Sequence, residues 1–127
     1  MIYIFSAFYA EAKNIIDHYG LKKEKSPEMV RFDVFANESI RLVITGVGEI
    51  NAAAAVSNIG GAYGISPDDE ILNVGCGAGF SSDICLGSIF LGNKLTEQMT
   101  GRTFYPDMLM KTNLMECEIV TVTRVLN

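Results

Sequence analysis

The chain has 127 residues, of which 49% are hydrophobic and 20% charged, so it is long and apolar enough for one folded domain, which we expect over residues 1–127. Ten basic against fifteen acidic residues give a net charge of −5 and no basic tract, which argues against a nucleic-acid partner because phosphate neutralisation needs a basic face. Three cysteines without CxxC spacing, and no apolar run near the roughly 20 residues that cross a bilayer, predict a cytoplasmic protein with no membrane partner, metal site or cofactor.

The first third of the chain predicts a strand and then a helix. Residues 2–7 form an apolar run too short for a helix, which favours a buried strand. Residues 9–19 place their apolar side chains at helical spacing, and Gly20 is a plausible end for this helix. The charged stretch that follows, through Pro27, predicts a loop.

A hairpin and a second helix are predicted next. Residues 29–36 alternate in polarity and residues 40–45 form a second run, and the short connection between them favours a β-hairpin. The glycines of residues 46–48 then open a helix rich in small residues that runs to about Tyr63.

The remainder of the chain predicts mainly strands and loops. We expect a turn at 67–70, strands at 71–74, 86–91 and 118–125, and a loop with short helical turns over 92–115.

This order of elements predicts an α/β fold with a mixed sheet covered by helices, in three αβα layers. The sequence ends directly after a predicted strand, with no helix to cover that part of the sheet. Because an uncovered sheet is prone to association, we expect either oligomerisation there or a longer fold of which this chain is a truncated part.

Two strand-to-helix junctions carry groups that could do chemistry. Glu11 lies in the first turn of the first helix, where an acidic side chain meets the helix dipole favourably. The same carboxylate, beside a ligand pocket, would orient or deprotonate water. At residues 45–49 the backbone amides could hold a hydroxyl or an anion, although glycines there also simply form a tight turn.

A third junction is the loop of residues 75–79, where three glycines alternate after the strand at 71–74. Loops at the carboxyl end of a strand commonly mark a small-molecule site in an α/β sheet. One interpretation is an S-adenosylmethionine-dependent methyltransferase, but that fold needs a helix after the glycines and then a strand ending in an acid. Neither is predicted here, so this interpretation is the less favoured one.

The three junctions together resemble the amino-terminal half of the purine nucleoside phosphorylase and methylthioadenosine/S-adenosylhomocysteine nucleosidase superfamily. The matching segments are Ser-Ala-Phe-Tyr-Ala-Glu at 6–11, Thr-Gly-Val-Gly-Glu-Ile-Asn-Ala-Ala at 45–53 and Asn-Val-Gly-Cys-Gly-Ala-Gly at 73–79. The resemblance implies the phosphorylase/nucleosidase-like fold and covers nearly the whole chain. It implies that Glu11 positions and activates the attacking water.

The resemblance also implies the pocket. Its substrate-binding residues would be Phe8, Val47, Gly48, Cys76 and Gly77 from the three junctions, and Phe104 from a segment that reaches a neighbouring subunit's pocket. Cys76 stands where a serine is usual, and we interpret it as a packing residue rather than a nucleophile.

The implied function is hydrolysis of the N-glycosidic bond of a purine nucleoside, of the 5′-methylthioadenosine/S-adenosylhomocysteine type, in a homodimer or higher oligomer. No arginine occurs before Arg31, which favours hydrolysis over phosphorolysis. The family's second half carries the residues that hold the ribose and protonate the leaving base, and this chain ends before both. We therefore expect an incomplete site, with a purine nucleoside phosphorylase or an inactive nucleoside-binding or assembly module as alternatives.

Overall fold

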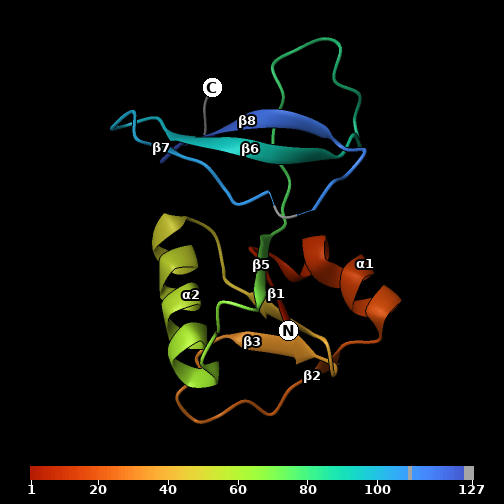
Figure 1. Ribbon diagram of the computed structural model, residues 1–127, viewed down its shortest axis with the longest axis vertical. Helices are drawn as coiled ribbons and strands as arrows, with labels where there is room; N and C mark the ends of the chain where they lie inside the picture. The colour runs from red at the N-terminus through yellow and green to blue at the C-terminus, as the bar shows by residue number, and fades with distance from the viewer. Residues whose placement is uncertain (109, 125–127) are drawn as a thin grey trace. The chain divides into compact units, whose positions relative to one another are not determined.

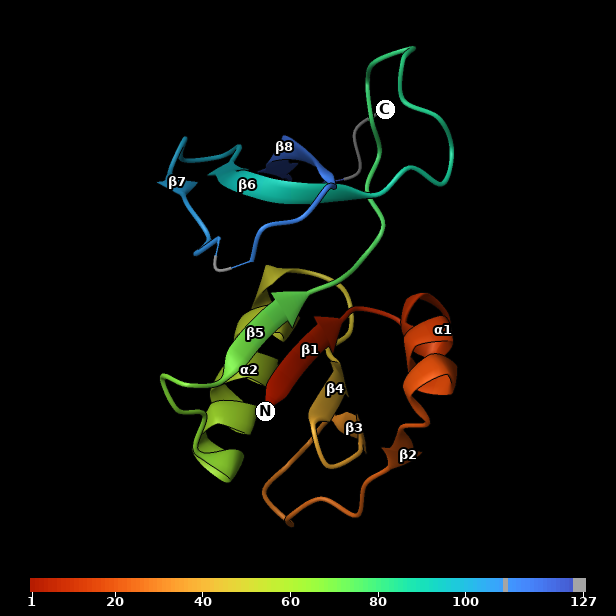
Figure 2. The same cartoon turned by 45° about the vertical axis from the view of Figure 1, so that its right-hand side comes forward.

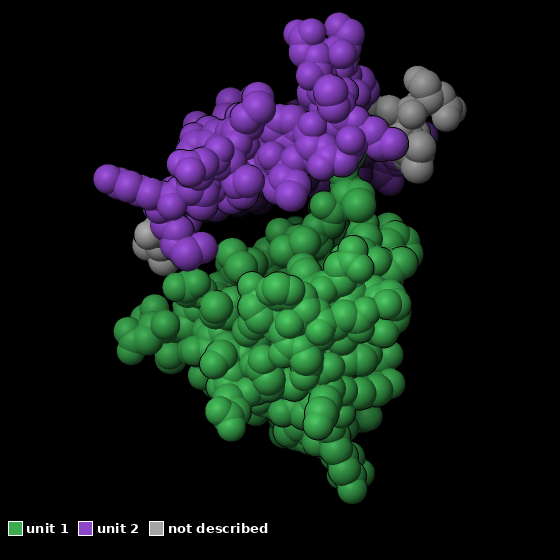
Figure 3. Space-filling view, turned by 90° about the vertical axis from the view of Figure 1, so that its right-hand side faces the viewer, with its two compact units in different colours: residues 1–77 green, residues 78–127 purple. Residues whose placement is uncertain are grey.

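The computed structural model describes residues 1–108 and 110–124, and the chain divides into two compact units, Met1–Gly77 and Ala78–Asn127 (Figures 1 and 3). Each unit has its own sheet, and we describe the two separately. All of the buried side chains among the described residues belong to the first unit. The first unit therefore contains the hydrophobic core, and it also contains two of the three predicted junctions and most of the third.

The first unit is built on a five-stranded mixed sheet in the order β2-β3-β4-β1-β5. The strands in that order are Lys22–Lys23, Asp33–Ala36, Ile40–Ile44, Ile2–Ser6 and Glu70–Asn73. Strand β1 pairs in parallel with β4 on one side and with β5 on the other, whereas β3 is antiparallel to β2 and β4. The carboxyl ends of β1, β4 and β5 therefore meet at one edge of the sheet.

Two helices cover the two faces of this sheet. Helix α1 (Tyr9–Tyr19) packs on one face and α2 (Glu49–Tyr63) on the other, as Figure 2 shows. Along β1, Tyr3 and Phe5 point toward α2, and Ile4 between them packs with α1. This alternation is the period of two that a strand imposes. The predicted three-layer αβα arrangement is thus confirmed for this unit.

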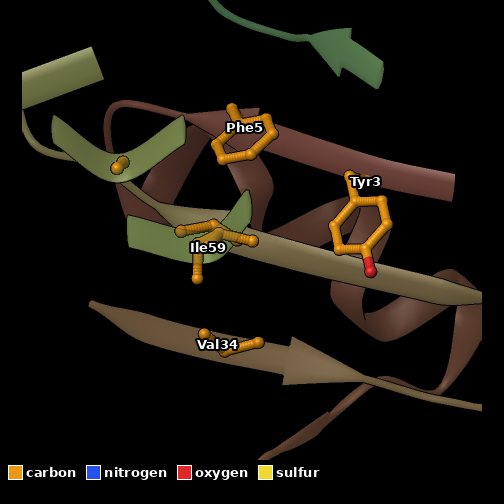
Figure 4. Packing of buried hydrophobic residues seen from close by; sticks show 6 residues of the cluster. Tyr3, Phe5, Val34 and Ile59 are labelled. Atoms are coloured by element: carbon orange, nitrogen blue, oxygen red, sulfur yellow. The ribbon is translucent and has the colours of Figure 1, made fainter. Parts of the chain in front are cut away.

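Each layer interface has its own cluster of buried side chains. The cluster against α2, part of which is shown in Figure 4, contains Tyr3, Phe5, Val34, Val43, Ala55 and Ile59. The cluster against α1 contains Ile4, Ala12, Ile16, Leu21, Ile40 and Leu42.

The helix and hairpin predictions for this unit are confirmed. Helix α1 has the predicted bounds, and Gly20 ends it in the left-handed conformation with φ 61°. The hairpin of β3 and β4 and the second helix to Tyr63 are also present.

Two predictions for the first unit are wrong. Lys22–Lys23 form an edge strand that pairs with Phe35 and Ala36, where a loop was expected. The strand predicted from residue 29 begins only at Asp33, because α2 bonds the preceding backbone. Asn58 accepts from the Arg31 amide at 3.1 Å and donates to the Met29 carbonyl at 3.0 Å.

The second unit has a three-stranded sheet in the order β7-β6-β8, with β7 at Thr103–Phe104, β6 at Phe90–Glu97 and β8 at Met115–Thr121. Strand β6 is parallel to β8 and antiparallel to β7. The strand predicted at 86–91 begins only at Phe90, because residues 85–88 form a turn with Gly87 at φ 86°.

The irregular segment predicted at 92–115 is also wrong, since it holds most of β6 and all of β7, and no helix occurs in its described part. The register between β6 and β8 is irregular between Gly92 and Lys94, which disturbs the alternation that the prediction needed. The final strand is present but ends at Thr121, and Val125 lies outside the described residues.

A polar network joins the amino-terminal part of β4 to α2. Arg41 donates to both carboxylate oxygens of Glu24 at 3.2 Å, and the Tyr63 hydroxyl donates to Glu24 at 2.8 Å. The guanidinium carbon of Arg41 lies 3.9 Å from the centre of the Tyr63 ring, a cation–π contact. The hydrogen bonds from Arg41 hold the pKa of the Glu24 carboxyl below its usual value of 4.5.

Replacing Glu24 by Gln is expected to lower the free energy of unfolding by about 1 kcal/mol at pH 7. Because the Glu24 pKa is lowered on folding, the carboxylate stabilises the fold above pH 4.5 and loses this contribution as the pH falls through its folded-state pKa. The difference between wild type and Glu24→Gln, measured by urea unfolding, should therefore shrink at pH 3. The exposed pair of Lys13 and Asp17 is the control, and Asp17→Asn should produce no measurable change.

Candidate functional site

The loops that follow β1 and β4 are joined at the carboxyl edge of the sheet. The Thr45 amide donates to the Ser6 carbonyl at 2.9 Å, and the Gly46 amide donates to the Ala7 carbonyl at 3.1 Å. These bonds continue the parallel β1–β4 ladder by two residues beyond the strands. Val47 is therefore held, through its neighbour Gly46, at the loop that leads into α1.

The Glu11 side chain contacts the loop of residues 75–79, which is the third predicted junction. Its Oε1 accepts from the Cys76 amide at 3.2 Å, and its Oε2 lies 3.4 Å from the donating Ser6 hydroxyl. The printed sequence separates Glu11 and Cys76 by 65 positions, so the pairing of β1 with β5 creates this contact. A Cβ added at Gly75 would lie 3.8 Å from Oε2, so the backbone of that residue also passes over the carboxylate.

This geometry bears on both interpretations of Glu11. The residue does lie in the first turn of α1, as the helix-dipole argument requires. Its hydrogen bonds, however, go to Ser6 and Cys76 and not to the free amides of the helix. The carboxylate is half-buried at the meeting point of three strand ends, which is the position expected of a group that acts on a ligand.

The β4–α2 junction is a tight turn that depends on glycine. Gly46 has φ 81° and Gly48, the N-cap of α2, has φ 98° and ψ 161°. No side chain caps the helix at Gly48. The side-chain amide Nδ2 of Asn51 instead donates to the Val47 carbonyl at 2.6 Å, which secures the turn, and the Val47 side chain is exposed.

The glycine loop after β5 differs from the β4–α2 turn in its backbone angles. None of Gly75, Gly77 and Gly79 has a positive φ, so the turn does not require glycine for its backbone angles. Cys76 and Gly77 are exposed, and a Cβ at Gly77 would meet no atom within 4 Å. No helix follows in residues 75–89, so the context that a methyltransferase loop needs is missing.

The two predicted aromatic pocket residues lie in different units. Phe8 is the N-cap of α1 and is 52% exposed, which leaves its ring accessible beside the loop that Gly46 contacts. Phe104 belongs to β7 of the second unit, where the Arg102 guanidinium lies 5.5 Å from its ring centre. The pocket roles of Phe8 and Phe104 both stay predictions.

Two residues of the site were not predicted as site residues. Ser6 and Thr45 are the only buried polar residues among those that the structure describes, and they end β1 and follow β4. The Thr45 hydroxyl donates to the Gly46 carbonyl at 2.7 Å. The signal in the sequence is a hydroxyl residue that directly ends an apolar strand, since such a residue is buried with the strand and needs a partner.

Residues 1–108 and 110–124 contain no group of three or more His, Cys, Asp and Glu side chains placed to hold a metal ion. Within the same residues, no helix has both the length and the apolar composition needed to span a membrane.

Replacing Gly48 by Ala is expected to lower the free energy of unfolding by about 1–3 kcal/mol, because its backbone angles lie in a region that only glycine adopts readily. A Cβ at Gly48 would meet no atom within 4 Å, so backbone strain is the whole effect. Gly77→Ala is the matched control, with equal space and no positive φ, and should leave urea unfolding unchanged. Equal effects of the two substitutions would contradict the assignment.

The chain is similar in structure to solved nucleosidases. It matches 5′-methylthioadenosine/S-adenosylhomocysteine nucleosidase from Neisseria meningitidis, in complex with methylthio-immucillin-A, with a TM-score of 0.77 at 16% identity over 97% of this chain and 64% of that one. A futalosine hydrolase mutant of Helicobacter pylori matches with a TM-score of 0.77 at 12% identity, over 99% of this chain and 69% of that one.

A Helicobacter pylori nucleosidase mutant with 5′-methylthioadenosine in its active site matches with a TM-score of 0.74 at 14% identity, over 97% of this chain and 64% of that one. No protein-family model and no curated protein sequence matches the chain. The chain therefore spans about two thirds of the length of these proteins, and at these identities the likeness shows the fold. The chain has the α/β fold of the nucleosidases that cleave 5′-methylthioadenosine, S-adenosylhomocysteine and futalosine.

Proposed function

We propose that this chain provides the water-activating part of a purine nucleosidase site, which hydrolyses the N-glycosidic bond of a 5′-methylthioadenosine- or S-adenosylhomocysteine-type nucleoside. The observation that carries the proposal is the Glu11 carboxylate, held by Ser6 and the Cys76 amide where β1, β4 and β5 end. The solved structures with the same fold support it, since one of them holds 5′-methylthioadenosine in its active site.

Glu11 would serve one side of the reaction. A water oxygen bonds to C1′ of the ribose while Glu11 accepts the water proton, and the C1′–N9 bond breaks with its electron pair passing to the purine. The departing purine must be protonated by a separate acid, because Glu11 is taking up a proton at that moment. Phe8, Val47, Gly48, Cys76 and Gly77 would bind the nucleoside around this carboxylate.

The placement of the arginines in the first unit supports water over phosphate as the nucleophile. Arg41 lies near the amino end of β4, and its guanidinium donates to the Glu24 carboxylate and to the Tyr3 hydroxyl. Arg31 precedes β3, and its backbone is held by Asn58. Neither guanidinium follows a strand at the carboxyl edge, where an attacking phosphate would need a cation.

The first test is binding and turnover by residues 1–127 with 5′-methylthioadenosine and with inosine, each with and without phosphate. We expect the amide resonances of Val47, Gly48, Cys76 and Gly77 to shift with nucleoside in NMR titrations. We expect free base to appear no faster than in buffer, because the carboxylate serves only the water side. Absence of binding would contradict the nucleoside site, and release of base at an enzymatic rate would contradict the division of the mechanism.

A binding or assembly module without chemistry is the second candidate. The observation that favours it is β5, an edge strand of its sheet among the residues that the structure describes, where Ile71 and Leu72 are exposed. Such a module would bind nucleoside and self-associate through this edge, which sedimentation measures. Both candidate functions are compatible with the homodimer or higher oligomer expected from the sequence, so self-association alone does not distinguish them.

A charged analogue distinguishes these two candidates without turnover. A water-activating carboxylate lies near C1′, where positive charge develops, so an analogue with a cationic ribose ring should bind about tenfold more tightly than the neutral nucleoside. Glu11→Gln, which keeps the shape of the side chain, should abolish this preference in calorimetric titrations. A module without chemistry predicts equal binding of both analogues, before and after the substitution.

A further inference from the structure

Ser6 is an unusual residue for its position. It is the last residue of β1 and only 1% exposed, in a strand whose three preceding residues are buried and hydrophobic. A buried hydroxyl costs free energy unless it is hydrogen-bonded. Among the described residues, the one partner of the Ser6 hydroxyl is Oε2 of Glu11. The hydroxyl therefore acts on Glu11, since an alanine would fill most of the same space without needing a partner.

The direction of the Ser6 side chain follows from the strand. Ile4 packs in the cluster against α1, and Ser6, two residues further on, shares that face of β1. Helix α1 begins at Tyr9, so its first turn passes over the end of the strand. This connection brings Glu11 to Ser6 within five positions of the chain, and no long-range pairing is needed.

The two donors occupy different oxygens of the carboxylate. Ser6 donates to Oε2 and the Cys76 amide donates to Oε1, from the ends of two neighbouring strands. A glutamate side chain with one donor would retain rotational freedom about its terminal bond, and a second donor removes it. At 3.4 Å the Ser6 bond is long, as hydrogen bonds of ligand-free active sites commonly are.

We propose that Ser6 is a positioning residue that orients the Glu11 carboxylate, so that Oε1 stays on the Cys76 amide. The chemical purpose of this orientation rests on the proposed function, in which Glu11 meets the attacking water. The orientation itself is a property of the ligand-free chain, and it is tested without a nucleoside.

The test is the rate at which the Cys76 amide hydrogen exchanges with solvent, measured by NMR. Ser6→Ala should speed this exchange about two- to tenfold, because the carboxylate that protects the amide is no longer held. Glu11→Ala removes the acceptor and sets the upper limit. In the Glu11→Ala background, Ser6→Ala should have no further effect at Cys76, since the two residues act in series.

Two controls separate positioning from general loosening. Ser57→Ala, at an exposed position of α2, should leave the Cys76 rate unchanged. The Val74 amide, which donates to the Phe5 carbonyl at 2.9 Å, reports on the β1–β5 pairing and should also be unchanged in Ser6→Ala. Equal acceleration at Val74 and Cys76 would overturn the proposal, and so would an unchanged Cys76 rate or equal acceleration in both backgrounds.

Should Ser6→Ala not fold, Ser6→Cys provides the comparison, because the thiol is of similar size and is a weaker donor. It should speed Cys76 exchange by less than Glu11→Ala does, and a rate equal to that of wild type would overturn the proposal. Failure of the wild-type chain to bind nucleoside would count against the proposed function alone, because the exchange experiment contains no ligand.

Discussion

The parallel pairing of β1 with both β4 and β5 is the constraint on which the rest of the first unit depends. A strand with parallel neighbours on both sides is covered on both faces, so its side chains must alternate between two apolar layers. Tyr3 and Phe5 satisfy one layer and Ile4 the other. The same pairing aligns three carboxyl ends at one edge, which is why residues distant in sequence meet there.

The carboxylates at the two ends of the parallel strands have different hydrogen-bond donors. Near the amino end of β4, Glu24 is paired with Arg41, whose guanidinium also stacks on Tyr63, so the charges there are internally satisfied. At the carboxyl edge, Glu11 receives only neutral donors, and no ion pair among the described residues includes it. A carboxylate oriented by neutral donors keeps its charge available for a proton or for positive charge on a ligand. The Glu24 carboxylate therefore stabilises the fold, whereas the charge of Glu11 stays available for the role that we propose for it.

The sequence was sufficient where local chemistry decides the structure. Helix α1 has helical spacing and a glycine at its end, and both features act within a few residues. It was insufficient where a distant partner decides. Residues 29–31 alternate like a strand, yet their backbone is bonded by Asn58 of α2. In the second unit, β6 lacks a clear alternation because its register with β8 is irregular, and its polar side chains Asn93 and Thr96 donate to Glu116 and Glu118. No local pattern could reveal either partner.

The fold is shared with solved structures at only 12–16% identity, and its construction explains why so little sequence is needed for it. Strand pairing uses backbone groups, and the layers require only apolar residues of suitable size, so many sequences satisfy both. The donor to Glu11 Oε1 is likewise the backbone amide of Cys76, which any residue except proline supplies. The cysteine, where the resemblance led us to expect serine, therefore leaves this bond intact. Ser6 is different, because its contribution comes from a side-chain hydroxyl that substitution removes. The fold therefore supplies the Cys76 donor whatever residue stands at position 76, whereas the Ser6 donor depends on the identity of the residue at position 6.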